Sequence, residues 1–300
     1  MFPIPRGALP CAAALAVLCG SAGCQAAGSQ AQAAGYDVPS VTPSAAQSGS
    51  PSPTPTRTVD YDDALRDALA GLPDGDGRYA VTVEDLGTGE DAAYGRGTFD
   101  TASIVKTDIL AALLLQAQDD GTSLTAEQQR LARAMICSSD NSATDALWRA
   151  IGRGDGLAAA NERLGLTDTT PGTGGLWGLT QTTAADQLRL LEAVFGEDSP
   201  LDGDSRSYLR ALMGDVVDAQ RWGVTAAADD PDEAALKNGW LPRTATGLWD
   251  VNSIGRVEHD GHTLLVAVLS SGHATEQAGI DLVERVATAA AEAMTTGTTN

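Results

Sequence analysis

The sequence predicts an α/β or α+β fold in which both ends of the chain build one sheet and helices pack against it. Two observations lead to this prediction. Segments with the alternating, Val-rich pattern of strands occur at residues 78–94 and again beyond residue 233. The residues between them carry a succession of helical patterns, which predicts an all-α lobe in the middle of the chain.

The first elements expected are a helix and a pair of strands. The helix runs from Tyr61 to Leu72 and ends at Pro73-Asp74-Gly75. The segment Arg78–Leu86 alternates as a strand does, and Glu90–Tyr94 is expected to pair back with it after a turn at Gly87–Gly89.

The middle of the chain is predicted to be helical. A long apolar helix is expected from Ser103 to Gln118, and Gly121 breaks the chain after it. Further helices are expected around residues 125–136, 141–151, 155–164, 182–195 and 205–218.

Strands are predicted again in the last third of the chain, at Glu233–Leu236, Leu248–Val257 and Thr263–Ser271. The stretch His259-Asp260-Gly261-His262 is interpreted as a hairpin turn rather than as a metal site. An amphipathic helix from Thr275 to Met294 is expected to complete the fold.

The N-terminal residues 1–23 have the features of a signal peptide. The charged Arg6 precedes an apolar run, Ala8–Leu18, that is too short to span a bilayer. Small residues from Ser21 to Gly23 directly before Cys24 resemble a bacterial lipoprotein signal, although such signals prefer leucine where Ser21 stands. We therefore expect an extracytoplasmic protein, lipid-anchored through Cys24 to the outer face of the bacterial cytoplasmic membrane. Ordinary secretion with cleavage nearby is the alternative.

Residues 24–57 are interpreted as a disordered tether, because they are mostly Ala, Gly, Ser, Gln, Pro and Thr and cannot bury enough apolar surface to fold. Residues 58–300 are predicted to form one folded domain, since neither an internal repeat nor a second linker interrupts them. Once Cys11 and Cys19 leave with the signal and Cys24 carries lipid, Cys137 is alone. We interpret it as a small buried residue, with a reactive thiol as the alternative.

The net charge of -21 at pH 7 disfavours nucleic acid and anionic lipid head groups as partners. Contact with the membrane is therefore expected through the lipid anchor only, and a monomer is expected. No metal and no cofactor are expected, because the three histidines lie near the C-terminal strands without further Cys or His ligands nearby.

Lys106 and Lys237 are the only lysines among the 19 basic residues, and all the others are arginine. An arginine cannot lose its proton at a workable pH, whereas a desolvated lysine can. The two lysines are therefore candidates for a site that needs an amine base or a compact ammonium group.

The first candidate motif is Ser103-Ile104-Val105-Lys106. Residues three apart share one face of a helix, so the Lys106 amine can approach the Ser103 hydroxyl and take its proton. A serine at a helix N-terminus also lies near free backbone N–H groups that can bind an oxyanion. The alternative is a helix cap followed by a surface lysine.

The second candidate motif is Ser139-Asp140-Asn141. The Ser139 hydroxyl could relay a proton to a leaving amine, and the Asn141 amide could bind an amide substrate. The alternative is an N-cap for the helix that follows.

The third candidate motif is Lys237-Asn238-Gly239-Trp240. Lys237 would supply positive charge, Gly239 would let a substrate backbone approach the strand, and the Trp240 N–H could be an oxyanion donor. A surface lysine before a turn is the alternative.

In this order the three motifs resemble the S-x-x-K, S-D-N and K-T-G elements of class A β-lactamases and penicillin-binding proteins. The resemblance covers about residues 61–294. It implies the β-lactamase-like fold, an antiparallel sheet flanked by helices beside an all-α lobe. By this resemblance Ser103 is the acylated nucleophile and Lys106 its general base or proton partner. Ser139 is the proton shuttle, Lys237 the electrostatic clamp and Asn141 a substrate contact. The N–H groups of Ser103 and Trp240 form the oxyanion hole.

The sequence departs from the family pattern at several points. The stretch Thr167–Thr183 corresponds to the Ω-shaped loop whose glutamate activates the deacylating water, yet its only acid is Asp168. Asn238 replaces the threonine whose hydroxyl normally meets a substrate carboxylate. Arg221 is a candidate for the carboxylate-binding arginine, with a surface arginine as the alternative.

Two further departures concern size. The segment from Ser103 to Ser139 is short for the family, so a trimmed helical lobe is expected. Trp240 stands where a small residue is common; it and three other tryptophans either wall the cleft or pack in the core, namely Trp177, Trp222 and Trp249.

The sequence therefore predicts a β-lactamase-type serine hydrolase that forms an acyl-enzyme on Ser103 with a β-lactam antibiotic or a related amide and deacylates slowly. Two alternatives remain open. One is an enzyme that acts on the D-alanyl peptides of the cell wall, and the other is a catalytically weak penicillin-binding lipoprotein.

Overall fold

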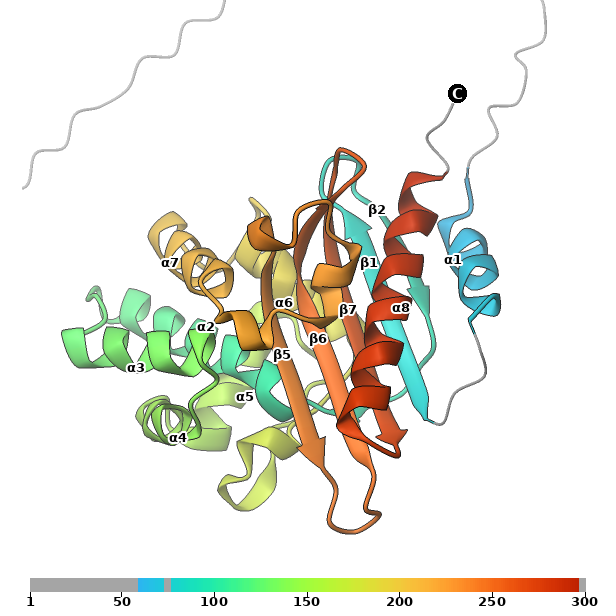
Figure 1. Cartoon of the computed structure of the whole chain (residues 1–300). Helices are drawn as coiled ribbons and strands as arrows, with labels where there is room; N and C mark the ends of the chain where they lie inside the picture. The colour runs from blue at the N-terminus through green and yellow to red at the C-terminus, as the bar shows by residue number, and fades with distance from the viewer. Residues whose placement is uncertain (1–58, 73–76, 297–300) are drawn as a thin grey trace, which may run out of the picture. The chain divides into compact units, whose positions relative to one another are not determined.

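A five-stranded antiparallel sheet forms the centre of the fold in the computed structural model, which describes residues 59–72 and 77–296 (Figure 1). The strand order is β2-β1-β7-β6-β5. The strands are β1 (Arg78–Asp85), β2 (Glu90–Tyr94), β5 (Ala235–Pro242), β6 (Trp249–His259) and β7 (His262–His273). Because β1 pairs directly with β7, the two ends of the folded region share one sheet, as the sequence predicts.

Several predictions fall on residues outside this description. They are the signal peptide of residues 1–23, lipidation of Cys24, the tether of residues 24–57 and the turn at Pro73-Asp74-Gly75.

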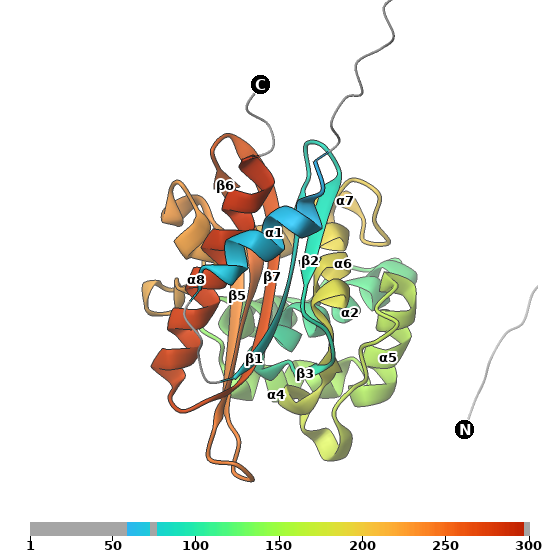
Figure 2. The ribbon, with the colours of Figure 1, turned by 90° about the vertical axis from the view of Figure 1, so that its right-hand side faces the viewer.

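Both faces of the sheet are covered (Figure 2). Helices α1 (Tyr61–Ala70) and α8 (Glu276–Thr295) pack on one face, over Val266 and its strand neighbours. On β7 the alternate residues Leu265 and Leu269 point instead into the core shared with the helical lobe. This two-sided burial explains why the β7 sequence is almost continuously apolar.

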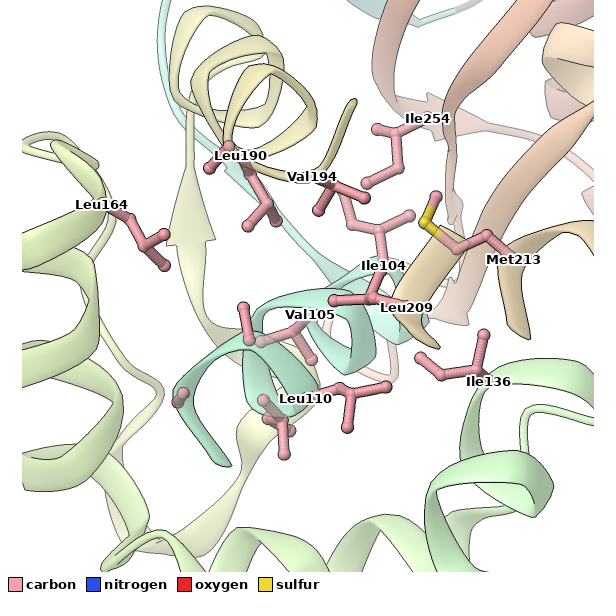
Figure 3. Packing of buried hydrophobic residues seen from close by; sticks show 14 of the residues in the cluster. Ile104, Val105, Leu110, Ile136, Leu164, Leu190, Val194, Leu209, Met213 and Ile254 are labelled. Carbon is pink, nitrogen blue, oxygen red and sulfur yellow. The ribbon is translucent and has the colours of Figure 1, made fainter. Parts of the chain in front are cut away.

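The helical lobe lies on the other face of the sheet (Figure 1). It consists of α2 (Val105–Asp119), α3 (Ala126–Cys137), α4 (Asn141–Ala150), α5 (Arg153–Leu164), α6 (Ala184–Phe195) and α7 (Gly203–Gly214). Every residue of α2 from Val105 to Leu115 is buried, as expected for a helix enclosed on all sides. Figure 3 shows side chains of Val105 and Leu110 surrounded by residues of neighbouring helices, including Ile136, Leu209 and Met213.

The predicted hairpin between the last two strands is confirmed. Asp260 and Gly261 connect β6 to β7 with φ angles of 47° and 80°. Positive φ at both central residues is the geometry that matches the twist of a two-residue hairpin.

The structure corrects some element boundaries. The predicted strand at Glu233–Leu236 is too short, because β5 continues to Pro242 by pairing along β6 despite its Lys, Asn and Gly residues. The predicted helix from Ser103 starts as a 3-10 turn, Ala102–Ile104, and becomes α-helical at Val105.

Several short elements of the structure were not predicted from the sequence. A second, two-stranded sheet joins β3 (Phe99–Asp100) to β4 (Gln181–Thr182), so the chain before Ser103 is tied to the loop after α5. Short 3-10 turns lie in two connecting regions, at Thr173–Gly175, Trp177–Leu179, Asp218–Gln220, Gly223–Ala227 and Pro231–Glu233. In the two described ranges, no helix is long and apolar enough to cross a membrane.

Candidate active site

The three candidate motifs meet at one place between the sheet and the helical lobe. The Lys106 Nζ lies 2.9 Å from the Ser103 Oγ and 2.9 Å from the Ser139 Oγ. It also lies 2.9 Å from the Asn141 Oδ1, and the Lys237 Nζ lies 3.1 Å from the Ser139 Oγ. The structure therefore brings together Ser103, Lys106, Ser139, Asn141 and Lys237 in a single hydrogen-bonded network.

Two non-glycine residues of the site adopt left-handed backbone conformations. Ala102, directly before the serine, has a φ of 48°, and Ser139 has a φ of 55°. Such conformations cost roughly 1–3 kcal/mol each and persist only where the surrounding structure imposes them. Here the buried core around α2 and the junction of α3 with α4 hold the two serine hydroxyls toward Lys106.

The N-cap of α4 is Asp140, whose carboxylate accepts a hydrogen bond of 2.6 Å from the Ala143 N–H. Asp140, the middle residue of the motif, therefore caps the N-terminus of α4. Its two neighbours, Ser139 and Asn141, both bind Lys106 instead.

Gly239 permits close packing of β5 against the turn that carries Ser103. A Cβ at this position would lie 2.7 Å from the Ser103 backbone nitrogen and 2.8 Å from the Thr101 oxygen. The same turn is tied to β6, because the Asn252 side chain donates to the carbonyl of Thr101 over 3.1 Å. The contact expected for Gly239 was with a substrate backbone, and the structure shows a contact with the chain itself.

Burial controls the charge of both lysines. Loss of solvation lowers the pKa of Lys106 to about 7, against the opposing effect of Asp140 and Asp145. Lys237 is fully buried, and burial together with the nearby Lys106 lowers its pKa well below the usual value. A neutral amine next to Ser103 is therefore accessible near neutral pH.

A cavity of about 310 Å³ opens onto the Ser103 side chain. Its walls come from the start of α4, the loop around residue 177 and the end of β5, and they include Asn141, Asp145, Trp177 and Trp240. The Trp177 indole N–H donates to the Asp145 Oδ1 over 2.8 Å, and the Trp177 ring centre lies 4.9 Å from the Lys106 Nζ. Asp145 was not predicted as a site residue; its position four residues after Asn141, on the same helix face, was the available signal.

The structure supports both interpretations of the tryptophans, because all four pack against a core and two of them also line the cavity. Trp177 and Trp240 line the cavity. Trp222 packs edge-on against Trp240 with ring centres 5.9 Å apart, and both Trp222 and Trp249 lie against the core beneath α8.

The Asn238 side chain does not line the cavity. It is buried, donates to the carbonyls of Gln220 and Trp222 over 2.8 and 3.0 Å, and accepts from the Ser253 Oγ over 2.6 Å. Alternation along β5 explains this, because Asn238 points to the opposite face from its neighbours Lys237 and Gly239.

The Arg221 side chain also binds outside the cavity. Its guanidinium donates to the backbone carbonyls of Gly214, Pro231 and Ala234, and it is not among the residues that line the cavity. It therefore holds a connecting segment in place.

The loop that follows α5 presents no carboxylate to the cavity. Asp168 is exposed and does not line it, while its backbone N–H donates to the Asp186 Oδ2 over 2.8 Å. Thr169 donates to the same oxygen over 2.7 Å. These contacts anchor the loop on α6 rather than on the reacting centre.

The remaining candidate groups lie away from Ser103. Cys137 is buried, its thiol pKa is raised by burial, and its Sγ lies 3.3 Å from the Leu212 carbonyl. His259 and His262 flank the β6–β7 hairpin and contact Ala227 and Asp85. Within residues 59–72 and 77–296, no group of three or more His, Cys, Asp or Glu side chains could hold a metal ion.

The sequence of residues 115–294 matches the model of a family described as the beta-lactamase enzyme family. The chain belongs to this family. The match includes Ser139 and Lys237 and starts after Lys106.

Solved structures of proteins that are called beta-lactamases have the same fold. A class A beta-lactamase from Bacteroides cellulosilyticus is 17% identical, with a TM-score of 0.67 over 80% of this chain and 100% of its own. A beta lactamase from Xanthomonas campestris is 21% identical, with a TM-score of 0.60 over 78% of this chain and 98% of its own. The predicted β-lactamase-like fold is confirmed, and the chain is a divergent member of the beta-lactamase enzyme family.

Among curated proteins, the chain is similar to one named "Putative lipoprotein LppW" in Mycobacterium bovis and Mycobacterium tuberculosis. The identity is 26% over 169 residues, or 54% of this chain and 54% of the relative. The chain thus spans about half the length of these relatives.

Proposed function

We propose that this family member is a serine hydrolase that forms an acyl-enzyme on Ser103 with β-lactams or related amides and releases the acyl group slowly. The observation that carries the proposal is the 2.9 Å contact between the Ser103 Oγ and a buried lysine amine. The pKa of this amine is lowered to about 7 by loss of solvation. An amine that is partly neutral near pH 7 can serve as a general base.

The network supplies a route for acylation. The Ser103 Oγ attacks the carbonyl carbon while its proton passes to the neutral Lys106 amine. The carbon–nitrogen bond then breaks, and the leaving nitrogen receives a proton through the Ser139 hydroxyl, which contacts both lysines.

Substrate binding is assigned to groups at the cavity wall. The Asn141 Oδ1 is held by Lys106, and its Nδ2 makes no hydrogen bond within the described part of the chain, so it can donate to the acyl amide. The backbone N–H groups of Ser103 and Trp240 are proposed to bind the oxyanion.

Slow deacylation follows from the composition of the loop after α5. Between Thr167 and Thr183 the only acid is Asp168, which does not line the cavity. Loss of a general base typically slows a step by about 10²–10⁴-fold. We therefore expect the acyl-enzyme to accumulate.

The test is intact-mass spectrometry of the purified protein after incubation with benzylpenicillin. We expect a covalent adduct that maps to Ser103 and decays slowly. The Ser103→Ala variant should form none, whereas Ser142→Ala, which removes an exposed serine of α4, should react as the wild type does. Absence of the wild-type adduct would contradict the assignment, and rapid turnover of a chromogenic cephalosporin would contradict slow deacylation.

Two other candidates are favoured by the same missing glutamate. One is an enzyme acting on D-alanyl peptides of the cell wall, and the other is a catalytically weak penicillin-binding protein. A transferred acyl group in the first case, or binding without an adduct in the second, would distinguish them from the hydrolase.

We further propose that the protein is a monomer anchored outside the bacterial cytoplasmic membrane by a lipid on Cys24. The residues before Cys24 and the name of the mycobacterial relative support this location. The corresponding organisation is a signal peptide at 1–23, a tether at 24–57 and a domain at 58–300.

A further inference from the structure

Asp145 is the only carboxylate residue among those that line the Ser103 cavity in the described chain. It lies on α4 one turn after Asn141, on the same helix face. The indole N–H of Trp177 fixes its Oδ1, whereas no hydrogen bond within residues 59–72 and 77–296 reaches its Oδ2. One carboxylate oxygen of Asp145 is thus held by Trp177, and the other can accept a hydrogen bond from a ligand in the cavity.

No positive side chain balances this carboxylate at the cavity wall. The residues that line the cavity in the described ranges include neither lysine nor arginine. Lys106 and Lys237 are fully buried and are engaged by Ser139, and Arg221 donates to backbone carbonyls. Asp145 interacts electrostatically with the buried Lys106, but no cation lines the cavity in the described ranges, so an anionic group entering beside Asp145 would meet a negative charge first.

The aromatic ring beside Asp145 favours a cation for a second reason. Trp177 lines the cavity, and one indole ring next to one carboxylate is a combination that binds ammonium groups by charge and by cation–π attraction.

We propose that Asp145 and Trp177 form a subsite for a positively charged amino group on the acyl portion of the substrate. The inference rests on the proposed function, because Asn141, one turn before Asp145, is the residue assigned there to the acyl amide. The substrate class is accordingly an acyl donor that carries an ammonium group near its reactive carbonyl, and acyl donors with a carboxylate in that place are disfavoured.

Three penicillins that differ at one substituent test this subsite. Ampicillin carries an ammonium group on the acyl side chain, benzylpenicillin carries hydrogen and carbenicillin carries a carboxylate, while the rest of the molecule is shared. The second-order rate constant of Ser103 acylation is measured for each by intact-mass time courses. We expect ampicillin to react at least about fivefold faster than carbenicillin, with benzylpenicillin between them.

The variant Asp145→Asn keeps the size of the side chain and removes its charge. We expect the ampicillin-to-carbenicillin ratio to fall to within about twofold of unity, because the charge that separates the two rates is gone. Asp198→Asn makes the same charge change at an exposed residue outside the cavity lining and should keep the wild-type ratio. Raising the salt from about 50 mM to about 500 mM should also reduce the wild-type ratio.

The outcomes separate this inference from the function on which it rests. Adducts that form at equal rates with all three penicillins would overturn the subsite and leave the acyl-enzyme proposal intact. A wild-type ratio that persists in Asp145→Asn would overturn the assignment to Asp145. Failure of all three penicillins to label Ser103 would overturn the proposed function and this inference with it.

Discussion

At the scale of single residues, the proposed chemistry of the site depends on how solvation sets the charge of Lys106. A surface lysine would stay protonated near neutral pH and could not take a proton from Ser103. In this fold the amine is fully buried, and the loss of solvation outweighs the effect of Asp140 and Asp145 on its pKa. Four oxygen atoms of Ser103, Ser139 and Asn141 lie within 2.9 Å of this amine and fix its position.

The first prediction concerns the pH dependence of acylation. With the neutral amine as the proposed base, the acylation rate constant should rise with pH through an apparent pKa of about 7 and then reach a plateau. Lys106→Arg should lose at least about 10²-fold of the rate, since a guanidinium cannot deprotonate. Quenched time courses followed by intact-mass spectrometry from about pH 5 to about pH 9 measure how the acylation rate constant depends on pH. Near-UV circular dichroism checks that the variant is folded. A flat profile would argue against Lys106 as the base.

At the scale of elements, the site depends on how closely β5 packs against the turn that carries Ser103. Lys237 and Gly239 lie on the face of β5 toward that turn. The Asn238 side chain lies on the opposite face, where it forms hydrogen bonds with Gln220, Trp222 and Ser253. β5 thus places Lys237 beside Ser139, and the absence of a side chain at Gly239 lets β5 pack closely against Ser103.

A second prediction follows for Gly239→Ala. The added methyl group would meet backbone atoms of Thr101, Ser103 and Ile104 at 2.7–2.8 Å, and backbone cannot move away as a flexible side chain can. We expect a stability loss of about 1–3 kcal/mol and at least about tenfold slower acylation. Gly203→Ala, at a position where a Cβ meets nothing within 4 Å, is the control and should change neither quantity appreciably. Urea unfolding and adduct formation measure the two effects, and a Gly239→Ala protein with wild-type acylation would disprove the packing argument.

At the scale of the whole folded region, each face of the sheet has its own core, and the candidate site lies on the face toward the helical lobe. The face toward the helical lobe carries Ser103 and its partners, and the other face is sealed by α1 and α8 around a separate core. Leu65 of α1 is fully buried in that second core. Helices α1 and α8 therefore contribute to stability from the face that does not carry Ser103.

The third prediction separates these two roles. Leu65→Ala should reduce the free energy of unfolding by about 2–5 kcal/mol, because it removes buried apolar atoms and leaves a cavity. The acylation rate constant should be unchanged at temperatures where the variant is folded. Leu248→Ala, at a residue that is 36% exposed, should cost less than about 1 kcal/mol. A slower acylation step in folded Leu65→Ala would show that the two faces are coupled.

Local patterns in the sequence were sufficient for most elements of the fold. The alternation in Arg78–Leu86 and the turn residues Asp260 and Gly261 predict a strand and a hairpin that the structure contains. The spacing of Ser103 and Lys106 predicts their contact in the same way, since residues three apart share a helix face. Such predictions succeed because they concern neighbours along the chain.

Tertiary structure alone decided the contacts between distant segments. Lys237 meets Ser139 across 98 residues because β5 continues beyond its local strand signal along β6. The position of Asn238 follows from that register, and the contact of Trp177 with Asp145 follows from the path of the loop after α5. Periodicity specifies which face of its own helix or strand a side chain takes, whereas the packing of sheet and lobe determines which faces meet.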